Sequence, residues 1–316
     1  MSLEFEKPIL ELETKISELK HLSESGDVNL KDEITKLENK LTKLILDCYS
    51  KLGAWEKTQL SRHPSRPYTL DYLPHICTNF MELHGDRTFA DDPAIVGGIG
   101  RIGRRPVMIL GHQKGRSTKE KVKRNFGMPR PEGYRKAKRL MNMAQRFDMP
   151  LITFIDTPGA YPGIGAEERG QSLAIAESIE TMTQLNVPII SVVIGEGGSG
   201  GALAIGVSDK ILMMQYSIYS VISPESCSSI LWKGPEKAQE AAKSLKLTAK
   251  DVFDLGIADE IIEEPLGGAH KNHLESAKRI KKSIKEQLNI LIDQKPEERL
   301  ALRYQKFRNI GFYSEN

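Results

Sequence analysis

The sequence predicts an α/β fold in which parallel strands alternate with helices. Short apolar runs recur through the middle of the chain and alternate with segments that have helical periodicity. Two of these runs lead into glycine-containing turns that open helices, as a strand does in a βαβ unit. Ligands of such folds gather at the carboxyl ends of the parallel strands, so we expect the functional site there.

Composition narrows the class of protein. The chain has 316 residues, which is enough for one large domain with appendages. No apolar stretch is long enough to span a bilayer, and the acidic start Met1–Glu6 resembles neither a secretory signal nor a transit peptide, so we expect a cytoplasmic location without membrane association. The three cysteines, Cys48, Cys77 and Cys227, are too far apart to predict a zinc pair or a disulfide framework. A net charge of +3 is too small to indicate nucleic acid.

Two helical patterns open the chain. Apolar residues recur every three or four positions from Ile9 to Leu19 and again from Leu30 to Leu44. The turn-forming run Ser23–Asp27 separates the two patterns, so they predict an antiparallel hairpin that lies against a partner or against the body. The run Arg62–Pro67 contains two prolines and is predicted to be a linker, with the core beginning near Tyr68.

The core then alternates strands with helices, beginning with a strand pair across 103–105. The predicted strands are Ile95–Ile99, Val107–Gly111, Leu151–Asp156, Ile189–Ile194, Ile211–Met214 and Tyr219–Ile222. The predicted helices are Gly133–Phe147, Glu167–Leu185, Gly201–Val207 and Pro235–Lys246, followed by two charged helices beyond Gly267. We therefore divide the chain into an N-terminal hairpin arm (1–60), a core (61–266) and a C-terminal helical segment (267–316).

The most informative feature of the core is the glycine-rich turn Gly195–Gly201. It follows an apolar strand and opens a helix, so it is predicted to leave backbone amides uncovered at a helix start. Amides at such a position stabilise an anion, and glycine lets the anion come close, which indicates an oxyanion hole. The alternative is that the glycines only permit a tight turn with close packing.

The segment Leu151–Gly163 repeats this order of strand, turn and helix. Its Asp156–Gly159 also occurs in GTPases, but the chain has no P-loop, which argues against GTP binding. The spacing Gly195-x-Gly197-x-x-Gly200 matches the dinucleotide-binding fingerprint, yet no acidic residue follows at the position that would bind the ribose.

A serine hydrolase is a better-supported alternative than a GTPase or a dinucleotide-binding protein. The run Gly197–Gly201 satisfies G-x-S-x-G around Ser199, and Asp259 followed by His270 or His273 keeps the hydrolase order. A simpler interpretation is that Ser199 caps the following helix.

One basic cluster lies between positions 116 and 139. It is either a solvated face or a contact for phosphates, such as the diphosphate and 3′-phosphate of coenzyme A. Nucleic acid is a weaker candidate because only Phe126 and Tyr134 interleave the charges. The cluster consists of Arg116, Lys119, Lys121, Lys123, Arg124, Arg130, Arg135, Lys136, Lys138 and Arg139.

Several long motifs resemble one family, the carboxyltransferase alpha subunit of multisubunit acetyl-CoA carboxylase. The resemblance covers nearly the whole chain, including the hairpin. The motifs that carry it are Gly111–Gly115, Arg124–Pro129, Asp156–Gly163, Gly165–Gln171, Gly195–Gly206, Gly53–Trp55, Arg66–Tyr72 and Glu264–His270.

The resemblance implies a crotonase-like spiral of ββα units and an α2β2 heterotetramer with a beta subunit. It also implies transfer of a carboxyl group from carboxybiotin, held by a separate biotin carboxyl carrier protein, to acetyl-CoA. The product, malonyl-CoA, is the first committed intermediate of fatty acid synthesis. ATP is consumed by a separate biotin carboxylase. The chain lacks a biotinylated-lysine motif and a cysteine-rich zinc ribbon, so we expect both to be supplied in trans and no metal to bind here.

The resemblance also assigns residues. Gly201 and Ala202 are expected to donate their amides to the ureido oxygen of biotin, with Gly197, Gly198 and Gly200 around the approach. The loop of Thr157, Pro158, Gly159, Ala160 and Tyr161 is expected to line the biotin pocket, and the thioester oxyanion hole to lie mainly on the beta subunit. Arg116, Lys119 and Lys123 are hypothesised to hold coenzyme A. A hydrolase or an acyl-CoA hydratase acting alone, and a non-catalytic scaffold, stay open as alternatives.

Overall fold

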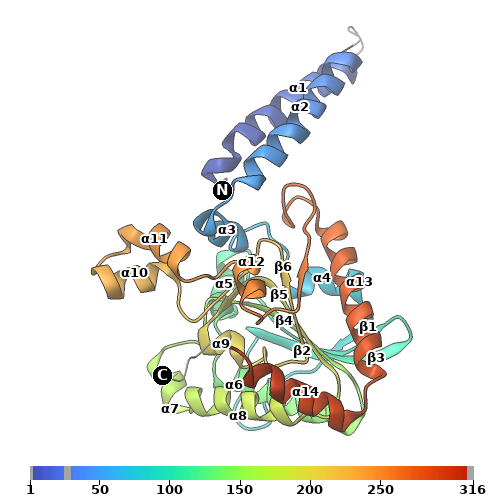
Figure 1. The fold of residues 1–316 in the computed structure, drawn as a ribbon, viewed down its shortest axis with the longest axis vertical. Helices are drawn as coiled ribbons and strands as arrows, with labels where there is room; N and C mark the ends of the chain where they lie inside the picture. Colours follow the sequence, from blue (N-terminus) through green and yellow to red (C-terminus); the bar gives the residue numbers. More distant parts are fainter. Residues whose placement is uncertain (1–2, 25–29, 312–316) are drawn as a thin grey trace.

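The computed structural model describes residues 3–24 and 30–311, and within them one eight-stranded sheet forms the centre of the molecule (Figure 1). Strands run in the order β1-β2-β3-β4-β5-β6-β8, while β7 pairs with the second half of β5. Pairing is antiparallel between β1, β2 and β3 and parallel from β3 onward. The strands are β1 (Thr78–Glu82), β2 (Ile95–Ile102), β3 (Arg105–His112), β4 (Leu151–Thr157), β5 (Ile189–Gly198), β6 (Lys210–Met214), β7 (Ile218–Ser220) and β8 (Glu260–Ile262).

The six predicted strands are confirmed as β2 to β7, including the hairpin across Gly103, whose φ is +64°. The edge strands β1 and β8 were not predicted, because each is short and only partly buried. The largest difference is at the end of β5: Gly195–Gly198 belong to the strand and are not a turn.

Helices cover both faces of the sheet. The predicted helix Glu167–Leu185 is two helices, since Gly170 takes a left-handed conformation (φ +78°) between them. The predicted Gly201–Val207 is the shorter α9, and Pro235–Lys246 begins with a 3-10 turn. The helices are α1 (Lys7–Glu24), α2 (Lys31–Ser50), α3 (Ala54–Ser61), α4 (Thr69–Ile76), α5 (Thr118–Lys123), α6 (Pro131–Arg146), α7 (Ile164–Glu168), α8 (Gln171–Gln184), α9 (Ser199–Leu203), α10 (Pro224–Trp232), α11 (Ala238–Ser244), α12 (Ala249–Asp254), α13 (His273–Ile292) and α14 (Pro296–Arg308).

The sheet is buried on both faces, and β4 shows how the sequence achieves this. Leu151 and Ile155 point into the core formed with α6 and α8, whereas Ile152 and Phe154 point into the core formed with α4 and α13. Successive side chains of a strand alternate between faces, so a strand covered on both sides is a continuous apolar run. This is why the parallel strands could be recognised from the sequence.

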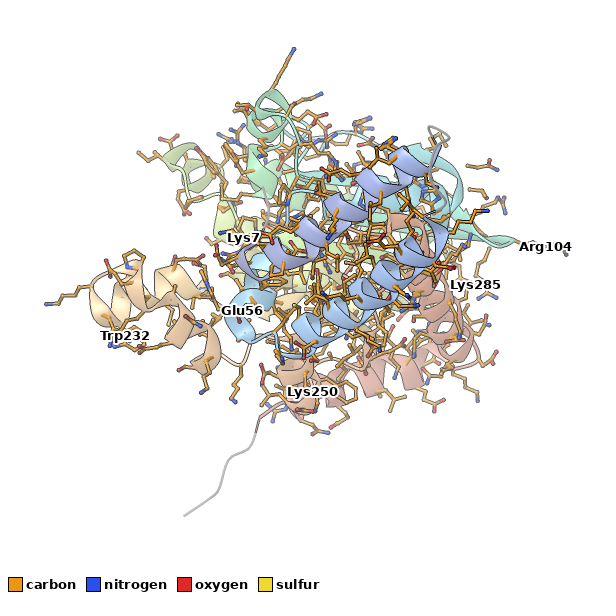
Figure 2. All side chains as sticks on the ribbon, turned by 90° about the horizontal axis from the view of Figure 1, so that it is seen from above. Lys7, Glu56, Arg104, Trp232, Lys250 and Lys285 are labelled. Atoms are coloured by element: carbon orange, nitrogen blue, oxygen red, sulfur yellow. The ribbon has the colours of Figure 1, made fainter. Side chains whose placement is uncertain are left out.

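The α1–α2 hairpin projects from the body as an arm (Figure 1). Ile9, Tyr49, Leu52 and Leu60 form a small apolar cluster with Tyr216 at its base. Most of the predicted turn Ser23–Asp27 lies outside the described residues. Beside α3, α10 and α11 form a lobe that carries Trp232 away from the sheet (Figure 2). The division at residues 60 and 266 stays a prediction.

The run Arg62–Pro67 is not the free linker that its prolines suggested. Arg66 is 1% exposed, donates from Nε to the Ile194 carbonyl at 2.7 Å and forms a buried ion pair with Glu264. Both charges of this pair are removed from water, so the pair is stable only because each is hydrogen-bonded. The prolines correctly indicate a break between helices, but proline composition does not tell whether the segment is exposed or packed against the body.

The two helices expected beyond Gly267 are α13 and α14, and α14 is held by Arg303. This residue is 2% exposed, pairs with Asp209 through two nitrogens and donates to the carbonyls of Met182, Leu185 and Val187. None of the described helices is both long and apolar enough to cross a membrane.

We expect Arg303→Met to lower the free energy of unfolding by about 3 kcal/mol, because it leaves the buried Asp209 carboxylate without its cation. Denaturant unfolding measures the change. The control is Arg308→Met on the same helix, which removes an exposed guanidinium and should change stability by less than about 0.5 kcal/mol. Equal effects of the two substitutions would contradict this role of Arg303.

Candidate active site

The two glycine-containing motifs meet at the carboxyl ends of β4 and β5. A Cβ atom added to Gly201 would lie 2.6 Å from the Ala160 nitrogen and 2.6 Å from the Gly159 carbonyl carbon. A Cβ added to Gly198 would overlap the Pro158 carbonyl. The loop 157–161 and the start of α9 therefore pack backbone to backbone, and glycine is required at both contacts.

The other predicted glycines have different neighbours. Gly197 faces the ring of Tyr219 so closely that a Cβ would overlap it. Gly200 is open by comparison, because an added Cβ would meet only Ile175 among the described residues, at 3.7 Å. Gly159 has φ +151° and no described atom within 4 Å of an added Cβ. The space beside Gly159 and Gly200 is thus the accessible part of the motif.

The first turn of α9 provides backbone donors. Gly198 is the N-cap residue of α9, and no side chain accepts a capping hydrogen bond from the first turn. Ser199 therefore does not cap this helix, contrary to the simpler interpretation. The amide of Gly201, at the third helical position, has no intrahelical acceptor, whereas Ala202 is the first residue whose amide has one, the Gly198 carbonyl. Gly201 is therefore the freer donor of the predicted pair. With five residues, α9 contributes through these amides more than through a macrodipole.

A buried network of charges lies beside this turn. The Nζ of Lys114 is 2.8 Å from Asp156 Oδ1 and 2.8 Å from Glu196 Oε1. Arg62 pairs with the second oxygen of Glu196 at 2.7 Å and with Glu225 at 2.6 Å. Lys114 follows β3, Asp156 lies in β4 and Glu196 in β5, so the network joins the ends of three neighbouring strands.

The pKa values of these groups follow from burial and from each other's charge. Burial lowers the pKa of Lys114, but the carboxylates of Asp156 and Glu196 outweigh it and raise the pKa above its ordinary value. Burial raises the pKa of Asp156, and Glu196 adds to this effect. For Glu196 burial acts in the same direction, yet Lys114 and Arg62 bring its pKa below the ordinary value. Lys114 therefore stays charged at neutral pH.

The serine-hydrolase triad is not assembled. Asp259 pairs with Lys306 and accepts from the Ile211 amide, and His270 is bonded to Glu6. His273 is bonded to the Ser65 carbonyl. Ser199 is exposed, at φ +53°, and makes no hydrogen bond to a histidine within the described part of the chain.

The basic run 116–139 divides into two groups, of which the first lies around α5. Lys119 and Lys123 are exposed and have no ion-pair partner among the described residues. Arg116 differs, because its guanidinium donates to the Pro64 carbonyl and pairs with Asp71. The two lysines are free to bind an anion, while Arg116 already holds the segment that precedes α4.

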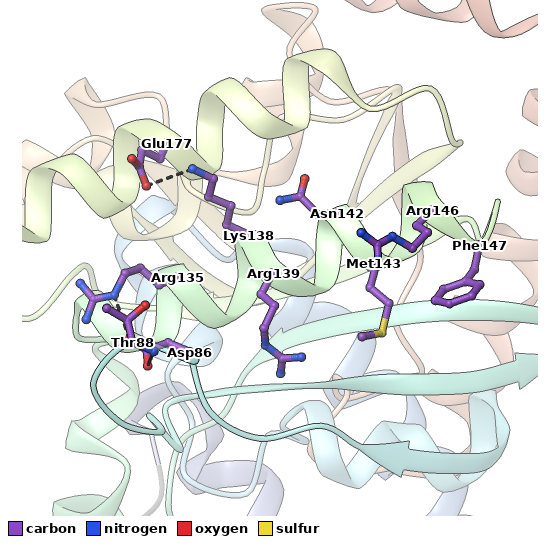
Figure 3. Close-up of a pocket in the computed structure, with 10 residues that line it drawn as sticks. All are labelled: Asp86, Thr88, Arg135, Lys138, Arg139, Asn142, Met143, Arg146, Phe147 and Glu177. Atoms are coloured by element: carbon purple, nitrogen blue, oxygen red, sulfur yellow. Dashed lines mark hydrogen bonds and ion pairs between the residues drawn. The ribbon is translucent and has the colours of Figure 1, made fainter.

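The second group lies on α6 and lines a pocket of about 490 Å³ (Figure 3). Arg135 pairs with Asp86, Lys138 with Glu177, and Arg139 donates to the Gly85 carbonyl. These cations fasten the loop 84–91 and α8 to α6, so most of their charge is compensated within the protein. Of the predicted site residues, none lines this pocket.

Three described residues are arranged so that they could hold a metal ion: Glu6, His63 and His270, whose ligand atoms lie within 4.8 Å of one another. Hydrogen bonds from His270 and Tyr49 outweigh burial and lower the pKa of Glu6 to about 2. The Ser65 amide donates to Nδ1 of His63 at 3.2 Å, which places the proton of a neutral ring on Nε2. We therefore interpret these residues as a hydrogen-bonded contact between the arm and the body and not as a metal site.

Sequence reasoning missed the charged residues beside the glycines. Lys114 stood inside the recognised motif Gly111–Gly115, and Asp156 and Glu196 stood at two predicted strand ends. The signal available was the position of one charged residue at the end of each of three consecutive strands. Arg62 gave no signal, because its partner Glu196 is 134 positions away.

Comparison with known proteins decides the family. A family model described as acetyl co-enzyme A carboxylase carboxyltransferase-like matches residues 2–311. The chain belongs to this carboxyltransferase family. A relative from Marinomonas sp. (strain MWYL1), named acetyl-coenzyme A carboxylase carboxyl transferase subunit alpha, is 59% identical over 309 residues and 98% of both chains. One of the same name from Vibrio campbellii (strain ATCC BAA-1116) is 60% identical over 313 residues, again 98% of both chains.

Similarity to solved structures supports the crotonase-like fold predicted for this chain. The chain resembles transcarboxylase 12S with a TM-score of 0.57 at 18% identity, over 72% of this chain and 44% of that one. It resembles the beta subunit of geranyl-CoA carboxylase from P. aeruginosa with a TM-score of 0.58 at 16% identity, over 78% and 46%. The hydrolase alternative is not favoured by these family relationships.

For this carboxyltransferase we expect Gly201→Ala to lower kcat by about 100-fold or more, because the new Cβ pushes the loop 157–161 from the amides by a fraction of an ångström to an ångström. Gly201→Val should abolish transfer. Gly165→Ala in α7 is the control, because among the described residues its Cβ would approach only the flexible end of Arg169, at 3.2 Å, and it should keep most activity. Similar kcat values for the two alanine variants would refute the contact as the cause.

Proposed function

We propose that this chain is the alpha half of an acetyl-CoA carboxylase carboxyltransferase that makes malonyl-CoA from acetyl-CoA, the first committed step of fatty acid synthesis. The observation that carries the proposal is the meeting of Gly201 and the loop 157–161 at the strand ends, in a chain about 59% identical to relatives bearing that subunit name.

Carboxybiotin supplies the carboxyl group, and negative charge develops on its ureido oxygen as that group leaves. The amides of Gly201 and Ala202 are the donors we assign to this oxygen. Preorganised amides need no rearrangement as charge develops, and removing one such donor costs about 3 to 4 kcal/mol in comparable sites. The amide of Gly201 lacks an intrahelical acceptor, which fits this task.

The shape of the site also fits a flat, uncharged ring. Gly159 and Gly200 leave open space beside the donors, and Gly197 and Gly198 keep the strand end close to its neighbours. Thr157 holds the loop by donating to the Gly159 carbonyl at 2.8 Å. Pro158, Ala160 and Tyr161 complete the wall that we assign to the biotin side. Lys114 and its carboxylates fix the strand ends, and no side-chain base is needed from this chain.

A second oxyanion forms on the thioester of acetyl-CoA. We place the oxyanion hole for the thioester on a beta subunit, because the amides of Gly201 and Ala202 already serve the ureido oxygen. Exposed apolar side chains support such a partner: Leu203 of α9, Ile164 of α7 and Leu173 of α8 lie on contacting elements next to the glycines. Apolar patches of this kind mark interfaces. We propose an α2β2 heterotetramer in the cytoplasm, served by a biotin carboxyl carrier protein and a biotin carboxylase.

The test of the function is malonyl-CoA formation from acetyl-CoA and carboxybiotin, measured with this chain alone, with a beta subunit alone and with both. Activity only in the mixture is expected, since the two oxyanion holes lie on different subunits. Activity of the chain alone would point to a free-standing enzyme, and no activity in any mixture would overturn the proposal. Ser199→Ala should keep most activity, because no step uses its hydroxyl.

We further propose that the free lysines of α5 bind the phosphates of coenzyme A. The variant Lys119→Glu/Lys123→Glu should raise KM for acetyl-CoA about tenfold and leave kcat nearly unchanged, since reversing two charges weakens ground-state binding of an anion. Lys278→Glu/Lys285→Glu on α13 is the control for net charge, because both lysines are exposed. An unchanged KM in the α5 variant would overturn this assignment.

A further inference from the structure

Gln171 is a buried polar residue that the proposed mechanism does not use. It is the first residue of α8, and its exposed fraction is only 4%. It follows Gly170, whose left-handed conformation separates α7 from α8 and turns the chain inward at this point. A side-chain amide that is removed from water must find its hydrogen-bond partners within the protein.

The side-chain nitrogen of Gln171 uses both of its hydrogens. Nε2 donates to the Pro129 carbonyl and to the Tyr161 carbonyl, each at 2.9 Å. Because carbonyl oxygens only accept hydrogen bonds, these two neighbours fix which end of the side-chain amide faces them. Oε1 points elsewhere and has no hydrogen-bond partner among the described residues. The side chain is therefore held in place by the two bonds that its nitrogen donates.

The two carbonyls belong to different segments of the chain. Tyr161 is the last residue of the loop 157–161, whereas Pro129 lies just before α6. The Tyr161 amide donates to the same Pro129 carbonyl at 3.0 Å. The amide group of Gln171 thus joins three segments at one point: the end of the loop, the approach to α6 and the start of α8.

The position of the loop relative to Gly201 depends on both of its ends. The first end is held by β4 and by Thr157, whose Oγ1 donates to the Gly159 carbonyl at 2.8 Å and accepts from the Gly159 amide at 3.1 Å. The second end is held by Pro129 and Gln171. Gly159 and Ala160 lie between the two ends, and their backbone packs against Gly201. A change at the Tyr161 end therefore reaches the contact with Gly201 within two residues.

We propose that Gln171 is a positioning residue whose side-chain amide fixes the Tyr161 end of the loop 157–161 and thereby sets the width of the biotin site beside the Gly201 amide. The inference rests on the proposed function and adds to it a residue that touches no reacting atom. Loss of the two bonds releases the wall that we assign to biotin and leaves the α5 lysines that we assign to coenzyme A in place. The two substrates should therefore respond differently to a change at Gln171.

The first test is the kinetics of Gln171→Met in the reconstituted complex of this chain with a beta subunit. Methionine has a similar length but donates no hydrogen bond. We expect KM for carboxybiotin to rise about tenfold and kcat to fall about tenfold, with KM for acetyl-CoA unchanged. The matched control is Gln184→Met at the other end of α8, where the side chain is exposed, and it should behave like wild type. Wild-type kinetics in Gln171→Met, or an equal rise in KM for both substrates, would overturn the proposal.

A second measurement does not depend on activity. Amide hydrogen exchange of the full chain should be about tenfold faster at 159–161 in Gln171→Met than in Gln184→Met, with β4 and β5 equally protected in both. Unchanged exchange at 159–161 would contradict the inference.

If Gln171→Met does not fold, Gln171→Glu repeats both measurements, because glutamate keeps the shape of glutamine and its carboxylate has no hydrogen to donate. If the wild-type complex makes no malonyl-CoA, the proposed function fails. If it does and the Gln171 variant matches it, only the inference about Gln171 fails.

Discussion

The arrangement of the site depends on the ammonium group of Lys114. Asp156 and Glu196 lie at the ends of neighbouring strands, and the Glu196 amide donates to the same Asp156 oxygen that Lys114 binds. Two buried carboxylates so close together repel each other unless a cation lies between them. Lys114 supplies that cation, so β3, β4 and β5 end at one level and present their loops on one side. Removing one member of such a network is far more costly than a surface ion pair.

This network changes the interpretation of the glycines. A Cβ at Gly195 would overlap the Asp156 carboxylate. The first glycine of the run therefore leaves room for the Asp156 side chain and does not form a turn. Gly197 admits the ring of Tyr219, and Gly198 and Gly201 admit the backbone of the loop 157–161. Close packing therefore accounts for most glycines of the run, including Gly201. Anion binding stays a proposal for the Gly201 amide, beside the open side of Gly200.

The sequence was sufficient for the buried strands and for the two motifs that meet, because apolar runs and glycine clusters are local signals. It was insufficient where the deciding contact is distant in the chain. Gly195–Gly198 looked like a turn because glycine composition does not distinguish an extended conformation from a bend. The run 116–139 looked uniformly basic, since the partners that separate the engaged Arg135 from the free Lys119 lie elsewhere, as Asp86 does. Helix breaks at single glycines, as at Gly170, have no periodic signature either.

The segment between α3 and α4 has a mechanical consequence. Arg62 is bonded to Glu196 and Arg66 to the carbonyl of Ile194, so two guanidinium groups four residues apart hold the end of β5 from the side of the arm. A segment held in this way is a fixed connection between the arm and the sheet and not a flexible linker. A displacement of the hairpin base therefore reaches the strand end that carries the glycines through these two arginines, unless their hydrogen bonds break.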